Sequence, residues 1–149
     1  MRVIVLVENT SISKDYKSKH GLCLYIETKK HKLLFDLGSN SLFLENAVKL
    51  GVNITDIDSV IISHGHNDHG GALKYFLENN AKANIYISRY AFEEYYANFL
   101  GMKWNVGLDR KLKDHPRIIL IEDEYVIDEE LQIFSNNHKD IYKMKTSSK

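Results

Sequence analysis

Hydrophobic residues in this chain gather in short runs separated by polar or glycine-containing segments, a pattern that indicates a sheet with few helices. Each run predicts one strand, and the predicted strands are 2–8, which is rich in β-branched residues, 21–28, 31–36, 59–63, 84–88, 117–122 and 131–135. Lys29 and Lys30 form a charged turn between two of these runs, so this pair is predicted to be a hairpin. The run from Val3 to Val7 is hydrophobic at consecutive positions, as in strands buried on both faces.

Helical periodicity predicts three helices. The first spans 41–50 and ends at Gly51, and the second spans 71–79. The third is an aromatic stripe within 90–99, which we interpret as core rather than as the lining of a substrate pocket. Residues 101–114 show no periodicity and predict an irregular loop of the kind that is often functional.

Composition narrows the class of protein. At 149 residues the chain is long enough for one domain with a real core, 1–149, and 44% hydrophobic with 27% charged residues is ordinary for a globular protein. The net charge is zero, which argues against nucleic acid or an anionic membrane as a partner. No apolar run approaches the roughly 20 residues that cross a bilayer. The first apolar run, Val3 to Val7, is too short for a signal peptide, so we expect a cytoplasmic protein.

Three further features are interpreted as structural. Cys23 is the single cysteine, so no internal disulfide is possible, and its apolar neighbours predict a packed thiol rather than a nucleophile. The polar connection 9–20 is predicted to be a solvated loop rather than a substrate loop. Residues 139–149 are rich in lysine and predict a frayed tail.

The most specific stretch holds three of the seven histidines and one aspartate within six residues, His64 to His69. Its pattern, H-x-H-x-D-H, arises by chance in roughly one chain in a thousand of this composition. Residues two apart in an extended segment point to the same side, so His64 and His66 can bind one metal together. Gly65 lets the backbone between them bend. The competing interpretation is a polar turn whose histidines only satisfy hydrogen bonds.

Asp68 and His69 add an oxygen and a nitrogen donor for a neighbouring position. Imidazole and carboxylate suit zinc, and also iron or manganese. Two such metals about 3.5–4 Å apart can share a hydroxide, which is a nucleophile at neutral pH. Asp36 lies upstream, at the end of the predicted strand 31–36 and shortly before Gly38. On the residues alone, it is either a turn residue or a carboxylate that supports a ligand histidine.

The stretch from Ser63 to Gly71 resembles the metal-binding loop of the metallo-β-lactamase superfamily. The resemblance implies two divalent metals, with His64 and His66 binding the first and Asp68 and His69 the second. It also implies that Asp36 supports the loop, and that Asp68 orients a metal-bound hydroxide for catalysis. Many relatives read H-x-G-G after the motif, whereas this chain has Gly70 directly after His69, an exchange that should keep the turn.

A wider resemblance covers most of the chain. The segments 5–10, 20–22, 33–38 and 46–51 follow the order of the branch related to dihydropterin ribofuranosylaminobenzene-phosphate synthase. The family implies an α+β fold, an αββα sandwich of two similar halves, of which this chain is expected to be the first. A third histidine, a bridging aspartate and a last histidine are expected from the family but are not found after residue 80. His115 and His138 lack the expected surroundings.

Three functions remain open. The leading hypothesis is a metal-dependent hydrolase that acts on an acyl or phosphoryl centre of a small-molecule substrate, most plausibly with zinc. The alternatives are a non-catalytic scaffold with a vestigial site, and a synthase-like condensation on a pterin and a phosphoribosyl-type substrate. Half a sandwich would leave one face of its sheet bare. A homodimer, a separately encoded second half or a segment folded back could cover this face, and of these we favour the homodimer.

Overall fold

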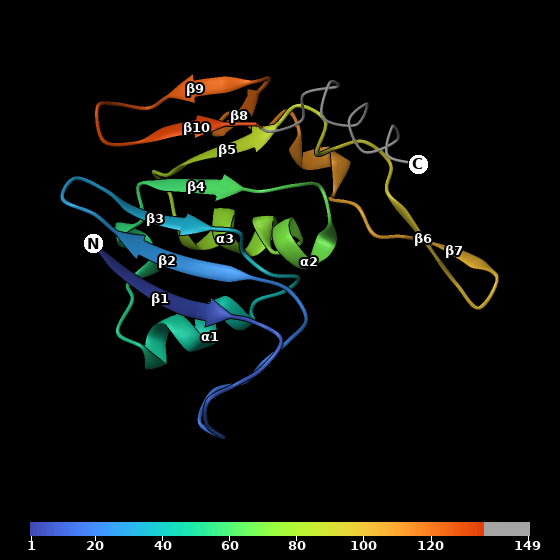
Figure 1. Cartoon of the computed structure of the whole chain (residues 1–149), viewed down its shortest axis with the longest axis horizontal. Helices are drawn as coiled ribbons and strands as arrows, with labels where there is room; N and C mark the ends of the chain where they lie inside the picture. The colour runs from blue at the N-terminus through green and yellow to red at the C-terminus, as the bar shows by residue number, and fades with distance from the viewer. Residues whose placement is uncertain (136–149) are drawn as a thin grey trace, which may run out of the picture.

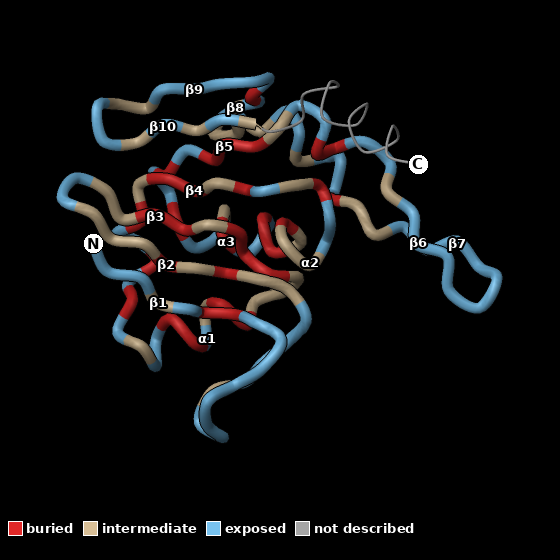
Figure 2. The backbone as a smooth tube through the Cα atoms, in the orientation of Figure 1, coloured by how far each residue is buried: buried red, intermediate tan, exposed pale blue. Residues whose placement is uncertain are grey.

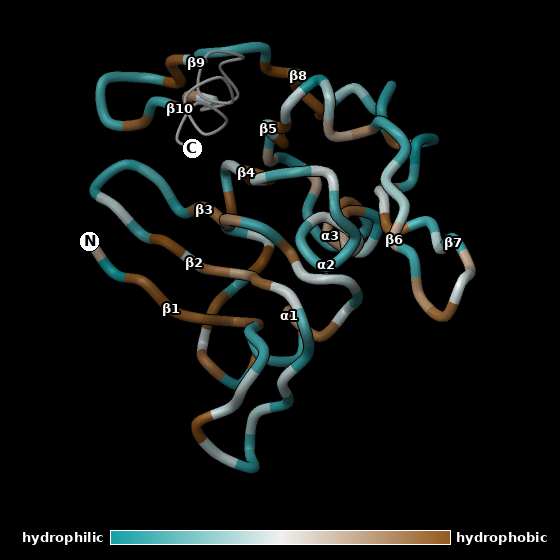
Figure 3. Tube along the Cα trace, turned by 45° about the vertical axis from the view of Figure 1, so that its right-hand side comes forward, coloured by the Kyte–Doolittle hydropathy of each residue, from teal (hydrophilic) through white to brown (hydrophobic). Residues whose placement is uncertain are grey.

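A mixed six-stranded sheet forms the centre of the protein, in the strand order β1-β2-β3-β4-β5-β8 (Figure 1). The structure is a computed structural model and describes residues 1–135. The strands of this sheet are β1 (Arg2–Val7), β2 (Cys23–Glu27), β3 (Lys32–Phe35), β4 (Ser59–Ile62), β5 (Asn84–Ser88) and β8 (Ile118–Ile121). The first three strands pair antiparallel, and β3, β4, β5 and β8 pair parallel. The hydrophobic stretches of the chain coincide with these strands (Figure 3), and the predicted α+β class is confirmed.

Helices cover one face of this sheet. They are α1 (Leu42–Lys49), α2 (Asn67–Gly70) and α3 (Leu73–Asn79), with a short 3₁₀ turn at Ile54–Asp56. Phe43 from α1 and Phe76 from α3 are fully buried, in one core with strand residues such as Leu34 and Val60. Burial of each phenylalanine contributes about 1.5–3 kcal/mol to folding. Within residues 1–135, no helix has the length and apolar character needed to cross a membrane.

The predicted positions of these elements are largely confirmed. Each of the strand runs that enter the sheet forms a strand within a few residues of its predicted bounds. The predicted hairpin around Lys29 and Lys30 joins β2 to β3. The predicted helix at 71–79 is α3, and it is preceded by the short α2. Cys23 lies on β2 with no exposed surface, which confirms the packed thiol. Burial, and then the negative charge of Asp36, raise the pKa of this thiol well above its usual value.

The predicted aromatic helix at 90–99 is wrong. Its second half is strand β6 (Tyr96–Phe99), which pairs antiparallel with β7 (Met102–Asn105) in a hairpin that projects from the body (Figure 1). Both turn residues between the strands have positive φ, 49° at Leu100 and 76° at Gly101, as tight hairpin turns require. The aromatic residues fit a helical spacing but also favour strands. The tight turn at Leu100 and Gly101 therefore determines that this segment forms a hairpin. Of the stripe, Phe92 is buried, whereas the hairpin is exposed throughout (Figure 2).

Residues 101–114 are correspondingly more ordered than predicted. Besides β7 they contain a 3₁₀ turn at Arg110–Leu112, whose preceding Asp109 accepts a hydrogen bond from the Lys111 backbone N–H. Leu108 in the same segment is buried in the core. This part of the chain is therefore anchored at Leu108 and is not a free loop.

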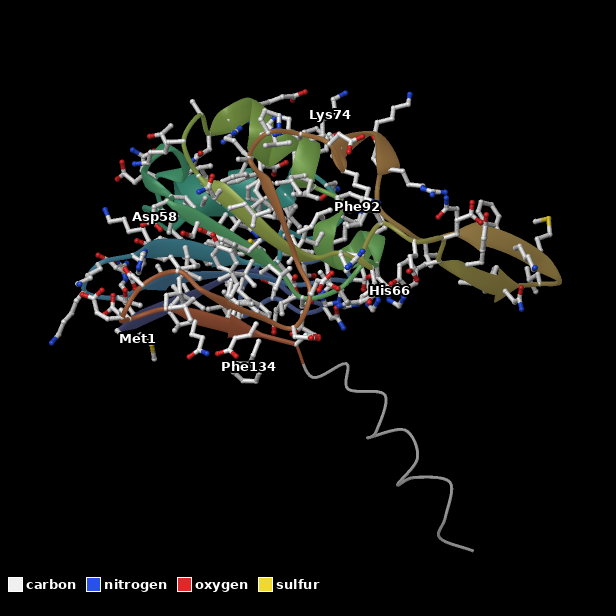
Figure 4. The ribbon with its side chains drawn as sticks, turned by 90° about the horizontal axis from the view of Figure 1, so that it is seen from above. Met1, Asp58, His66, Lys74, Phe92 and Phe134 are labelled. Atoms are coloured by element: carbon white, nitrogen blue, oxygen red, sulfur yellow. The ribbon has the colours of Figure 1, made fainter. Side chains whose placement is uncertain are left out.

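A second small hairpin lies on the sheet face opposite the helices (Figure 4). It consists of β9 (Glu124–Val126) and β10 (Gln132–Phe134), which pair antiparallel. The strand predicted at 131–135 is therefore confirmed as β10, while β9 was not predicted. The ring of Tyr125 lies 5.2 Å from that of Tyr86 on β5, measured between centroids. The expected folded-back segment thus exists for part of this face.

The hairpin of β9 and β10 covers only part of the sheet face opposite the helices. A cavity of about 430 Å³ remains between the sheet and β10 and reaches from Phe35 to His64. On the edge strand β1, Val3 and Val5 keep 49% and 46% of their surface exposed. The expected homodimer therefore stays a prediction. Light scattering after size exclusion should give twice the chain mass, and a monodisperse monomer that binds no hydrophobic dye would contradict it.

Charged contacts fasten the turn of the second hairpin to the turn between β2 and β3. The ring of His31 lies between two carboxylates, with Nδ1 3.1 Å from Asp58 and Nε2 2.8 Å from Asp128. Glu130 accepts hydrogen bonds from the Thr28 hydroxyl and from the backbone of the lysine turn. Lys30 forms an ion pair with Glu129. Polar contacts of the His31 ring therefore join the hairpin to the sheet.

The His31 contacts predict a pH-dependent stability. Burial lowers the pKa of His31, but the hydrogen bonds and charges of Asp58 and Asp128 outweigh it and raise the pKa above its usual value of about 6.5. A raised folded-state pKa stabilises the fold fully below about pH 6.5, and this contribution is lost as the pH rises through the folded pKa. Urea unfolding at a series of pH values should show the loss in the natural chain. The loss should be smaller in His31→Gln and in Asp128→Asn, and equal slopes in all three proteins would contradict the assignment.

Candidate metal centre

The histidine motif lies at the edge where the parallel strands β3 and β4 end. Strand β3 is followed by Asp36, and β4 by Ser63 and His64, so the sheet brings both segments together. The loop is fastened on two sides. The Leu37 N–H donates to the His69 carbonyl at 2.7 Å, and the Asn67 N–H donates to the Val106 carbonyl at 2.7 Å. The backbone of the motif is thus fixed by residues from two other parts of the chain.

The four residues predicted as ligands lie side by side. The ring centroid of His64 is 4.2 Å from that of His69 and 4.7 Å from that of His66. Asp68 Oδ2 is 3.4 Å from His69 Nε2. His66 also meets the edge of Tyr95 at 5.2 Å between centroids, and Figure 4 shows it at the end of the sheet. Three imidazoles and one carboxylate therefore gather at one partly exposed point.

Asp36 is buried beneath this cluster with no exposed surface. Its carboxylate accepts hydrogen bonds from the Ser63 N–H at 2.8 Å, the Ser63 hydroxyl at 2.7 Å and His69 Nδ1 at 2.7 Å. A proton on Nδ1 of His69 leaves Nε2 as the nitrogen with a free lone pair. Asp36 has φ of 57°, a conformation in which aspartate is tolerated better than most residues. It does not cap α1, whose N-cap is Ser41.

Two glycines permit close contacts at the loop. A Cβ on Gly65 would lie 2.2 Å from the Ala91 carbonyl oxygen. Glycine therefore lets the motif backbone lie close to the backbone at Ala91. The sequence predicted bending instead, and Gly65 is not among the glycines with positive φ. Gly21 has φ of 133°, and a Cβ there would lie 2.2 Å from the Asp68 carbonyl oxygen. Gly21 thus brings the connection between β1 and β2 against the motif.

The electrostatics of the cluster favour neutral imidazole at His64. Burial, and then the charges of His69 and His66, lower the pKa of His64 below its usual value. The Ser63 hydroxyl lies 2.8 Å from His64 Nδ1. A neutral imidazole keeps a lone pair, which is the form that binds metals.

His20 is a neighbour that the motif did not reveal. Its Nε2 lies 3.1 Å from Asp68 Oδ2, although residues 21–67, with three strands and helix α1, separate the two in sequence. In the sequence next to His20, the glycine that follows it was the one sign of a close backbone contact. The other histidine considered for the site, His115, accepts a hydrogen bond from the Arg117 N–H in the turn before β8. His138 lies outside the described residues.

The chemistry of the donors fits a divalent metal, since imidazole nitrogen and carboxylate oxygen are the ligands that zinc takes in proteins. Asp36 supports this fit because it fixes the His69 tautomer through a buried hydrogen bond. As the side chains lie, no three His, Cys, Asp or Glu of residues 1–135 are arranged to hold a metal ion. Binding would therefore require these side chains to rotate from their present positions.

Comparison with known proteins agrees with this geometry. A family model described as the metallo-beta-lactamase superfamily matches residues 19–146. An uncharacterized protein of Methanocaldococcus jannaschii, MJ0448, is 32% identical over 132 residues. Those residues are 85% of this chain and 50% of that protein, so the chain spans about half the length of the curated relative it matches.

Solved structures also match the fold of this chain. The crystal structure of Tm1679, described as a metal-dependent hydrolase of the β-lactamase superfamily, matches with a TM-score of 0.67 and 26% identity. The match covers 89% of this chain and 46% of Tm1679. A quorum-quenching N-acyl homoserine lactone lactonase matches with a TM-score of 0.55 and 19% identity, over 76% of this chain and 49% of the lactonase. The second likeness concerns the fold alone.

Proposed function

Since this chain belongs to the metallo-β-lactamase superfamily, we propose that it is a metal-dependent hydrolase whose active centre is the loop from His64 to His69. The observation that carries the proposal is the gathering of three imidazoles and Asp68 above a buried carboxylate that fixes one of the rings. The similarity to Tm1679 supports the reaction class. We propose two divalent metals of the zinc type, with His64 and His66 holding the first and Asp68 and His69 the second.

Each residue has a role in this proposal. His64 and His66 hold their metal through neutral imidazole nitrogens, and His69 presents Nε2 because Asp36 occupies Nδ1. Asp68 binds metal, orients the attacking water towards the substrate and accepts its proton. When bound, a divalent metal lowers the pKa of water and polarises an acyl or phosphoryl centre. The substrate is a small molecule with such a centre.

Two other functions have an observation in their favour. As the side chains lie, no three potential ligands among residues 1–135 are arranged to hold a metal ion, and this favours a scaffold with a vestigial site. The order of the segments 5–10, 20–22, 33–38 and 46–51 favours a synthase-like condensation, in which the same loop would assist loss of pyrophosphate. Metal content separates the first alternative from the hydrolase, and the products formed separate the second.

The test is metal analysis followed by activity measurement. The protein is purified without chelator, its metals are measured by mass spectrometry, and it is then titrated with zinc, iron(II) and manganese(II). The hydrolase hypothesis expects about two equivalents per assembled site and zinc-dependent cleavage of nitrophenyl esters or phosphodiesters. Protein that stays metal-free under all three titrations would overturn it in favour of the scaffold.

A further inference from the structure

The connection between β1 and β2 carries a histidine to the metal loop from outside the motif. His20 Nε2 lies 3.1 Å from Asp68 Oδ2, close enough for an ion-pair contact. The His20 side chain is 79% exposed and that of Asp68 is 26% exposed, so the contact lies at the mouth of the cluster. An exposed pair of this kind contributes little to folding. The contact therefore points to an effect on Asp68 rather than on folding.

Hydrogen bonds fix the backbone on both sides of His20, and one of them reaches the metal loop. After it, the Leu22 N–H donates to the Asp68 carbonyl at 3.3 Å, and Gly21 donates to the Asn9 side chain at 3.1 Å. Before it, the Lys19 N–H donates to the Glu8 carbonyl at 3.1 Å. These bonds leave little freedom for the backbone that carries the ring, although the side chain is exposed.

Gly21 makes this arrangement specific. Its φ of 133° is a conformation that residues with a side chain rarely adopt. Any Cβ at this position would collide with the Asp68 backbone at 2.2 Å. The chain therefore has a glycine at a position where the connection passes too close to the Asp68 backbone for a side chain. The placement of His20 opposite Asp68 follows from backbone geometry.

We propose that His20 is a positioning residue, which donates a hydrogen bond from Nε2 to Asp68 Oδ2 and thereby holds the Asp68 carboxylate for metal binding. His69 Nε2, at 3.4 Å, is the other group near that oxygen. Within residues 1–135, no hydrogen bond or ion pair engages Asp68 Oδ1, which is left as the donor oxygen. A carboxylate held through one oxygen presents the other in a fixed direction. The inference rests on the metal-binding function proposed above.

The experiment compares the zinc affinity of His20→Ala, His20→Gln and the natural chain by competition with a chromophoric chelator. Loss of such a supporting hydrogen bond should weaken zinc binding about 10–100-fold in His20→Ala. His20→Gln should recover much of the affinity, because its side-chain amide can also donate to Asp68. A histidine that bound the metal itself would not be replaced by glutamine. The midpoint of urea unfolding should be unchanged in both variants.

Lys19→Ala is the matched control, since Lys19 is the adjacent exposed residue and its contact to Glu8 uses only the backbone. It should bind zinc like the natural chain. Equal affinity of His20→Ala and the natural chain would overturn the positioning role and leave the metal-binding function intact. Failure of glutamine to restore affinity would overturn the hydrogen-bond role. A natural chain that binds no zinc would overturn the proposed function and this inference together.

Discussion

Replacing His64 by alanine is expected to abolish tight zinc binding, with an affinity loss well above tenfold, and His66→Ala is expected to do the same. Each substitution removes one of only four donors that the motif supplies. Loss of even a supporting contact typically costs 10–100-fold in metal affinity, so loss of a ligand should cost at least as much.

Zinc affinity by chelator competition and zinc content after dialysis measure this result. The matched control is His115→Ala, which removes a histidine from the turn before β8 and should leave zinc binding intact. Both ring substitutions lie on a partly exposed loop, so each variant should remain folded by circular dichroism. Unchanged stoichiometry and affinity in both variants would refute the ligand assignment.

Asp36→Asn is expected to weaken zinc binding about 10–100-fold while the protein remains folded. Asparagine tolerates the positive φ at this position, so the backbone is not strained. Its amide has one acceptor oxygen where the carboxylate has two, so Ser63 and His69 can no longer both be satisfied. A buried donor left without a partner costs about 1–3 kcal/mol, which this fold should tolerate.

Urea unfolding and zinc titration of the same preparation separate the two roles of Asp36. Ser63→Ala is the control, because it removes one hydroxyl donor but leaves the contact between Asp36 and His69. It should lose less zinc affinity than Asp36→Asn. If Asp36→Asn fails to fold but its folded fraction binds zinc normally, Asp36 is a turn residue and does not support the metal site.

The sheet could be predicted from the sequence because its strands are hydrophobic on both faces and bounded by clear turns. Val60 and Ile62 face the helices, and their neighbour Ile61 faces the cavity on the other side, so the run is continuous. The segment 90–99 could not be predicted in the same way. Aromatic residues suit a helix and a strand alike, and the deciding feature is the positive φ at Leu100 and Gly101.

Contacts distant in sequence explain what else was missed. Strand β9 is short and rich in polar neighbours, and its hairpin is held by the bonds of His31 and Glu130 rather than by a local pattern. The four motif residues could be identified from the sequence because they lie within six consecutive positions. On the residues alone Asp36 was either a turn residue or a supporting carboxylate, and only the resemblance favoured support, since its contact with His69 spans strand β4. His20 belonged to a segment of the wider resemblance but to no ligand pattern, and only the folded chain shows its contact with Asp68.

Cys23 gives the protein a built-in reporter of its own opening. It is the single cysteine, and its thiol has no exposed surface and a raised pKa, so a thiol reagent can reach it only when strand β2 separates from its neighbours. The labelling rate therefore measures how often the sheet opens around β2. Any ligand that binds only the folded chain should slow this labelling, so the reaction detects occupancy without an assay of catalysis.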